Sequence, residues 1–88
     1  MSPLNKKKLA IIRNKLDKLD NSLIKIIKQR TILVKKVLKL KDKKKQIVDK
    51  PRIKKILNNI KKKSILNNID PKITKRIWYN MIIVSSIE

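Results

Sequence analysis

The chain has 88 residues, about one small domain, with 26 Lys and Arg against 6 Asp and Glu, a formal charge of +20. It has no Cys, His or Gly, which excludes common zinc sites, cysteine nucleophiles, Ser-His-Asp triads, disulfide scaffolds and glycine-rich phosphate loops. We therefore expect no metal and no cofactor. No apolar run spans a membrane and the start does not resemble a signal peptide, so the expected protein is cytoplasmic, without membrane contact.

The excess of basic residues has two interpretations. A charge of +20 is typical of nucleic-acid-binding proteins. However, Lys, Ile and Asn make up more than half of the chain, and drift in an AT-rich genome gives the same composition. Lys outnumbers Arg 22 to 4, so an arginine indicates a position that needs a planar, bidentate donor. The four are Arg13, Arg30, Arg52 and Arg76.

The first predicted element is a helix from about residue 4 to about residue 43. Apolar residues recur there at alternating spacings of three and four, as in a coiled-coil seam. The seam positions are Leu9, Ile12, Leu16, Leu19, Leu23, Ile26, Leu33, Val37 and Leu40. Such a helix is roughly 55 Å long, whereas a compact monomer of this size has a radius of gyration of about 12 Å. Because one domain does not cover this seam, we predict a twofold homodimer.

Two shorter helices are predicted in the second half of the chain. Asp49 and Pro51 mark the start of a helix over about 50–66, and Asp70 and Pro71 mark a helix over about 71–88. The apolar positions of these two helices are Ile53, Ile56, Leu57 and Ile60, then Ile73, Ile77, Met81 and Val84. No segment alternates as a strand does. The sequence predicts an all-α fold of three helices in a single domain over residues 1–88.

One charged residue interrupts the seam of the long helix. Arg30 fills the slot between Ile26 and Leu33, where a guanidinium is costly unless it is paired. Arg30 either bonds a buried carboxylate, reaches solvent, or lines an anion pocket inside the bundle. Lys41 follows three turns later on nearly the same face, and two cations there would repel without an anion between them. Arg13 points to another face and would reach a partner's site across the seam.

The shorter helices contribute further candidates to this pocket. Asp49 and Arg52 flank the start of the second helix, where Asp49 also suits a plain N-cap. Trp78, Met81 and Ser85 share one stripe of the third helix. Trp78 and Met81 are typical of a core, and Ser85 also suits an ordinary helix serine.

A motif in the first helix carries a family resemblance. It reads Arg13-x-x-Leu16-Asp17-x-Leu19-Asp20-x-x-Leu23 and is followed by Arg30 and Lys41. This order and spacing resemble the first helix of the AroQ-type (all-helical) chorismate mutases. The resemblance extends from about residue 9 to residue 88 and continues through Asp49-x-x-Arg52, Ile69-Asp70-Pro71, Ile77-Trp78 and Met81-Ile82.

The resemblance implies an intertwined homodimer with two equivalent active sites. The reaction would be the Claisen rearrangement of chorismate to prephenate, in the shikimate pathway of aromatic amino acid biosynthesis. That isomerisation is pericyclic and needs no nucleophile, metal or proton shuttle. Chorismate carries two carboxylates, and negative charge develops on the breaking ether oxygen. A preorganised cationic pocket therefore suits this chemistry.

Roles follow from the matched positions. The resemblance implies that Arg30 holds one substrate carboxylate and that Lys41 faces the ether oxygen, as the catalytic pair. Lys41 would also hold the second carboxylate, together with Arg13 from the other subunit. Arg52 would support the carboxylate network, and Asp49 would lie near the ring hydroxyl.

Two further residues have implied roles, and two positions depart from the family pattern. Ser85 would assist the arginine on the first carboxylate. The family usually has Glu directly after the arginine of the second helix, where this chain has Ile53. The family also has a Gln or Glu late in the third helix, where it bonds the ether oxygen of the substrate. That position aligns one residue past Glu88, so Glu88 is the nearest candidate for this role.

Three other functions stay open at the level of sequence. One is a small basic nucleic-acid-binding helical dimer, which would show steeply salt-dependent binding. Another is a noncatalytic member of the same fold, given the two departures. The third is an isochorismate-pyruvate lyase, which shares the fold and a similar pocket.

Overall fold

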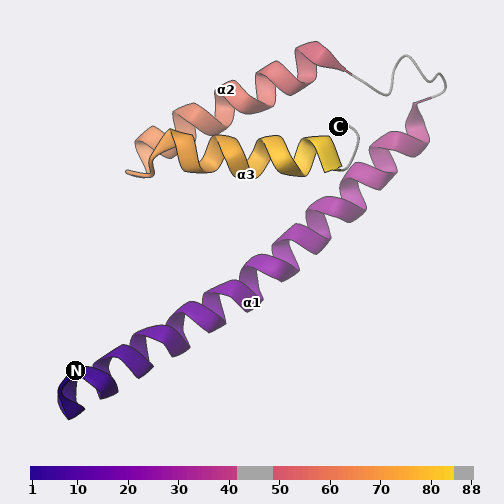
Figure 1. Ribbon diagram of the computed structural model, residues 1–88. Helices are drawn as coiled ribbons and strands as arrows, with labels where there is room; N and C mark the ends of the chain where they lie inside the picture. Colours follow the sequence, from indigo (N-terminus) through magenta and orange to yellow (C-terminus); the bar gives the residue numbers. More distant parts are fainter. Residues whose placement is uncertain (42–48, 85–88) are drawn as a thin grey trace. The chain divides into compact units, whose positions relative to one another are not determined.

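A computed structural model of the chain describes residues 1–41 and 49–84, and this part is helical with short connections. The helices are α1 (Pro3–Leu40), α2 (Lys50–Leu66) and α3 (Pro71–Val84) (Figure 1). The predicted all-α fold of three helices is confirmed. In the described residues α1 ends at Leu40, and the predicted end near residue 43 lies outside them. The third helix beyond Val84 lies outside the described residues.

All three helices begin with the same chemistry, a short capping side chain followed closely by proline. The Oγ of Ser2, the Oδ1 of Asp49 and the Oδ1 of Asp70 accept backbone N–H groups at 3.1, 3.0 and 2.9 Å. One of the three prolines of the chain stands within two residues after each cap. Proline fits there because its fixed φ is helical and its missing N–H has no partner in the first turn. The predicted starts of α2 and α3 are confirmed.

The end of α2 is a Schellman turn built without glycine. Asn68 takes a left-handed φ of 56°, its N–H donates to the Ile65 carbonyl at 3.2 Å, and the Ile69 N–H donates to the Ser64 carbonyl at 2.9 Å. These two bonds satisfy carbonyls that the last turn of a helix leaves open. Asparagine is the residue besides glycine that tolerates this conformation best, which suits a chain with no Gly.

Replacing Asn68 tests how much this turn contributes to stability. We expect Asn68→Ala to lower the free energy of unfolding by about 1 kcal/mol, because a Cβ without a local hydrogen-bonding group is disfavoured at positive φ. Asn68→Gly is expected to be neutral or stabilising. Urea unfolding of both variants checks this. A loss of stability in Asn68→Gly as large as that in Asn68→Ala would contradict the conformational explanation.

The described chain divides into two compact units, Met1–Ile32 and Leu33–Glu88. The first unit contains only residues of α1 and its start, so its apolar seam has no other element of the unit to pack against. Leu19 and Leu23, for example, are 65% and 54% exposed. A seam of large aliphatic side chains left this open within one chain is typical of a helix that packs against another copy or another protein.

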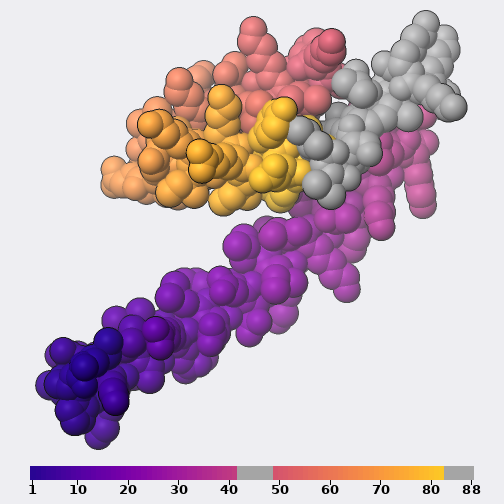
Figure 2. All heavy atoms as spheres, viewed as in Figure 1, coloured from indigo at the N-terminus to yellow at the C-terminus, as the bar shows by residue number. Residues whose placement is uncertain are grey.

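The second unit contains α2 and α3, which run side by side in opposite directions (Figure 1). In Figure 2 the side chains of these two helices meet along their length. Ile56 and Ile82 are buried, at 7% and 3% exposure. The predicted apolar face of α2 is confirmed, since the other members of that face are half-buried.

The predicted apolar stripe of α3 turns only partly toward α2. Ile73 and Ile77 are exposed, whereas Thr74 and Ile82 are buried and Pro71, Trp78 and Met81 are half-buried. The reason is a polar pairing that the apolar pattern does not predict. The hydroxyls of Ser64 and Thr74 lie 2.6 Å apart, and both residues are buried, at 3% and 8% exposure.

The two hydroxyls are fully accounted for by hydrogen bonds. The Ser64 hydroxyl lies 2.6 Å from the Ile60 carbonyl and the Thr74 hydroxyl 3.3 Å from the Pro71 carbonyl. A buried hydroxyl with its partners in place is tolerated, whereas an unsatisfied one costs about 1–3 kcal/mol. The pair therefore fixes the rotation of α3 against α2.

Across the described ranges, no helix combines the length and apolar character needed to cross a membrane.

Candidate functional site

Two of the predicted site arginines lie on α1, within the first unit. Arg13 is exposed and lines a shallow hollow of 720 Å³ together with Lys6 and Asp17. Arg30 is half-buried, the only charged residue of Met1–Ile32 that is not exposed. The two arginines are seventeen residues apart on one helix, about 25 Å along its axis. One chain therefore does not bring Arg13 and Arg30 to the same ligand.

Three more predicted site residues lie on either side of residues 42–48. Lys41 follows the last residue of α1, is half-buried, and its backbone N–H donates to the Leu38 carbonyl at 3.2 Å. Asp49 is half-buried and caps α2 through the Arg52 N–H, while the Arg52 residue itself is exposed in the first helical turn. The N-cap role of Asp49 is confirmed. Its place near a substrate hydroxyl stays a prediction.

The third helix contributes less to the described part of the site. Trp78 and Met81 are half-buried on the face of α3 that also carries Thr74, in keeping with their expected packing role. Ser85 and Glu88 lie outside the described residues, so their assignment stays a prediction. Ile53, at the position where the family usually has Glu, is half-buried on α2.

Sequence reasoning missed two features of the second unit. The first is the buried hydrogen bond between Ser64 and Thr74. Its signal in the sequence was a serine on an otherwise apolar face of one helix, with a threonine on the next helix. The second is a groove of 560 Å³ between α2 and α3 whose rim is lysine. Its signal was the recurrence of Lys50, Lys54 and Lys61 beside Ile53 and Leu57 on one helical face.

The chemistry of the predicted site is electrostatic. The described residues contain no cluster of three or more Asp or Glu side chains that could hold a metal ion. Arginine and lysine bind carboxylates and stabilise developing negative charge, and arginine does so with a planar, bidentate geometry. Arg13 and Arg30 in the first unit, with Lys41 and Arg52 in the second, are of the residue types that bind small anions, and their assembly into one site stays a prediction.

Comparison with known families identifies the class of protein to which this helical chain belongs. Residues 12–88 match the family model of chorismate mutase type II. The chain belongs to the chorismate mutase type II family, an all-α family of isomerases, as the sequence resemblance indicated. The matched span contains every predicted site residue from Arg13 to Glu88. Neither a curated protein nor a solved structure matches the chain.

Proposed function

We propose that this protein is an active chorismate mutase that rearranges chorismate to prephenate for the synthesis of aromatic amino acids. The observation that carries the proposal is the family match over residues 12–88. Within that span, Arg13, Arg30, Lys41 and Arg52 stand in the order and spacing of the family motif. In a chain with 22 Lys and 4 Arg, three arginines at these positions support a requirement for guanidinium groups.

Catalysis in this proposal rests on binding one conformer and one charge distribution. The guanidinium of Arg30 holds one carboxylate of chorismate with two parallel hydrogen bonds. The Lys41 ammonium faces the ether oxygen, where negative charge grows as the C–O bond breaks and the new C–C bond forms. Fixing the reactive conformer lowers the entropic barrier, and the fixed cation stabilises the transition state more than the ground state.

The second carboxylate is assigned to Arg13 of the other subunit, together with Lys41. Two observations support a shared site. Arg13 is about 25 Å along α1 from Arg30, so a ligand on Arg30 is beyond its reach in the same chain. The seam of α1 also has no other element of the first unit to pack against, which suits a homodimer of long helices.

Ile53 is a departure that bears on the binding of chorismate. Where the family usually places a carboxylate, this chain has an aliphatic side chain that accepts no hydrogen bond from a substrate hydroxyl. Arg30 and Lys41, the two groups assigned to the carboxylate and the ether oxygen, are both present. We therefore expect weaker binding of chorismate, seen in KM, rather than a lost reaction.

The decisive experiment is an assay of the purified full-length chain with chorismate. We expect first-order loss of chorismate with equimolar prephenate, identified by NMR, at a rate at least about 10⁴-fold above the uncatalysed reaction. Isochorismate is supplied in a parallel reaction and released pyruvate is measured. Activity should persist at physiological salt, because a pocket closed to solvent is screened less than surface charge.

Three results would each reject the proposal. Pyruvate release from isochorismate without prephenate formation would identify a lyase. No reaction with either compound, from a folded protein, would identify a noncatalytic member of the family. Tight, sequence-selective binding of DNA at physiological salt would favour the nucleic-acid-binding interpretation of the +20 charge.

A further inference from the structure

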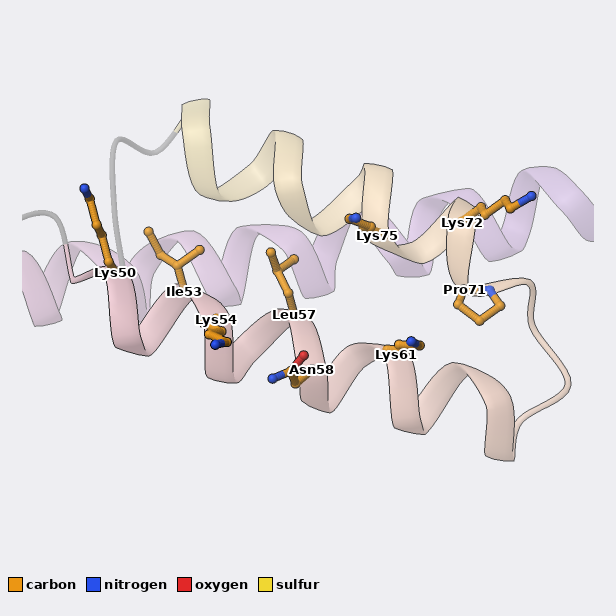
Figure 3. A pocket seen from close by; sticks show the side chains of 9 residues that line it. All are labelled: Lys50, Ile53, Lys54, Leu57, Asn58, Lys61, Pro71, Lys72 and Lys75. Atoms are coloured by element: carbon orange, nitrogen blue, oxygen red, sulfur yellow. The ribbon is translucent and has the colours of Figure 1, made fainter.

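The second unit carries a groove that shares Ile53 alone with the positions discussed for the proposed chorismate site. It lies between α2 and α3, has a volume of 560 Å³, and includes neither Asp49 nor Arg52 among its lining residues. Figure 3 shows Ile53 and Leu57 pointing from α2 toward α3 at its floor. Both side chains and Pro71 are half-buried, so packing of α2 against α3 leaves their apolar surface incompletely covered.

The rim of this groove is mostly basic, with Asn58 as its one uncharged polar residue. Five exposed lysines surround the floor, and no acidic residue is among the described residues that line it. The rim lysines are Lys50, Lys54 and Lys61 on α2, with Lys72 and Lys75 on α3 (Figure 3). Five ammonium groups at one groove raise the local positive potential and favour an anionic partner.

We propose that this groove is a docking site for an acidic amphipathic helix of a partner protein. A third helix fits into the groove between two packed helices, with its apolar stripe on the floor and flanking carboxylates against the lysines. Lys50 to Lys61 span about 16 Å of α2, which matches roughly three turns of a partner helix. This recognition mode joins an apolar contact with a charge contact, and the groove supplies both.

Charge and composition disfavour the other occupants. A second copy of this chain has 26 basic and 6 acidic residues, so it has few carboxylates to place against the rim, and in the proposed dimer it packs on the seam of α1 instead. Nucleic acid gains nothing from an aliphatic floor, and no arginine or aromatic residue is among the described lining residues to read or stack on bases. An acidic helix alone uses the floor and the rim together.

The test is the binding of a designed peptide to the full-length protein, followed by fluorescence anisotropy at low salt. The probe has about fourteen residues, with Leu at i, i+3, i+4 and i+7 and Glu on both sides of that stripe. A scrambled peptide of identical composition keeps the charge and loses the stripe. We expect micromolar binding of the designed peptide and at least about tenfold weaker binding of the scrambled one.

Two matched double variants locate the binding surface. Lys54→Glu/Lys61→Glu changes two rim lysines. Lys55→Glu/Lys62→Glu makes the same charge change at the same spacing, on exposed residues of α2 outside the groove. We expect the rim variant to weaken peptide binding by about tenfold or more and the second variant by less than about threefold. Thermal melts verify that both variants fold.

The proposal fails under any of five results. The designed and scrambled peptides could bind equally, or the two variants could weaken binding equally, and either result would make the effect one of general charge. Absence of peptide binding at the highest protein concentration would also overturn the proposal. So would a change in oligomeric mass in the rim variant that the second variant does not show. Duplex DNA that binds more tightly than the peptide, with loss confined to the rim variant, would make the groove a nucleic-acid surface.

Discussion

Arg30→Lys is expected to remove most of the activity on chorismate, lowering kcat/KM by about 10²-fold or more, although it keeps the positive charge. The reason is geometric. A guanidinium presents two parallel N–H donors to a carboxylate, whereas an ammonium presents a point charge on a flexible stem. If Arg30 fixes the reactive conformer of chorismate, the loss of that fork misaligns the reacting carbons.

The chain provides a matched control for this substitution. Arg76 lies exposed on α3 and is the one arginine without an assigned role, so Arg76→Lys is expected to leave kcat/KM within about twofold. Thermal melts of both variants complete the comparison. Near-full activity of Arg30→Lys, or a melting temperature that falls in step with the activity, would make Arg30 a structural residue of α1.

A substitution of Lys41 tests whether this residue acts on kcat or on KM. Lys41→Gln retains a hydrogen-bond donor and loses the charge assigned to the ether oxygen. We expect kcat to fall by about 10²-fold, because that charge interaction is stronger in the transition state than in the bound substrate. A rise in KM with unchanged kcat would restrict Lys41 to binding the carboxylate.

The fold was predictable from sequence where local chemistry determines it. The Asp49 and Asp70 caps and the prolines that follow them set the starts of α2 and α3, and the structure has both starts at the predicted residues. These signals act within one turn of helix, so a short stretch of sequence contains them completely. The end of α1 was less predictable, because the polar run after Leu40 has no comparable stop signal.

Features that depend on contact between helices were harder to predict. The rotation of α3 follows from the hydrogen bond between Ser64 and Thr74, and an apolar pattern assigns no energy to two hydroxyls that meet across a packed pair. The lysine-rimmed groove likewise forms only when α2 and α3 are side by side. Lys50, Lys54 and Lys61 do share one face of α2, but in a chain with 22 lysines this recurrence does not distinguish a groove from an ordinary solvated face.

The residue types of the candidate site could be predicted from the sequence. How these residues come together in space could not. Arg30 stands out because it interrupts an apolar seam, and Arg13 because arginine is rare in this chain. The structure of one chain separates Arg13 from Arg30 by seventeen residues of a single helix. Their common role therefore depends on a second copy, which sequence periodicity indicates without determining its geometry.

Mixing two inactive variants tests that common role. Sedimentation equilibrium of the unaltered protein is expected to give about twice the chain mass, since a homodimer covers the seam. Arg13→Ala and Arg30→Ala are each expected to be dimeric and nearly inactive. After unfolding and refolding together in equal amounts, they should recover about a quarter of the original activity. Half of the dimers are then mixed, and each mixed dimer has one of its two sites intact.

The recovery depends on the site being shared between subunits. If Arg13 and Arg30 served one ligand in the same chain, every site in the mixture would lack one arginine and no activity would return. Refolding Arg13→Ala with Arg13→Ala/Arg30→Ala is the control, because no dimer in that mixture has an intact site. A monomeric mass for the unaltered protein, or mixed dimers that form without activity, would contradict the assignment of Arg13 to the partner's site.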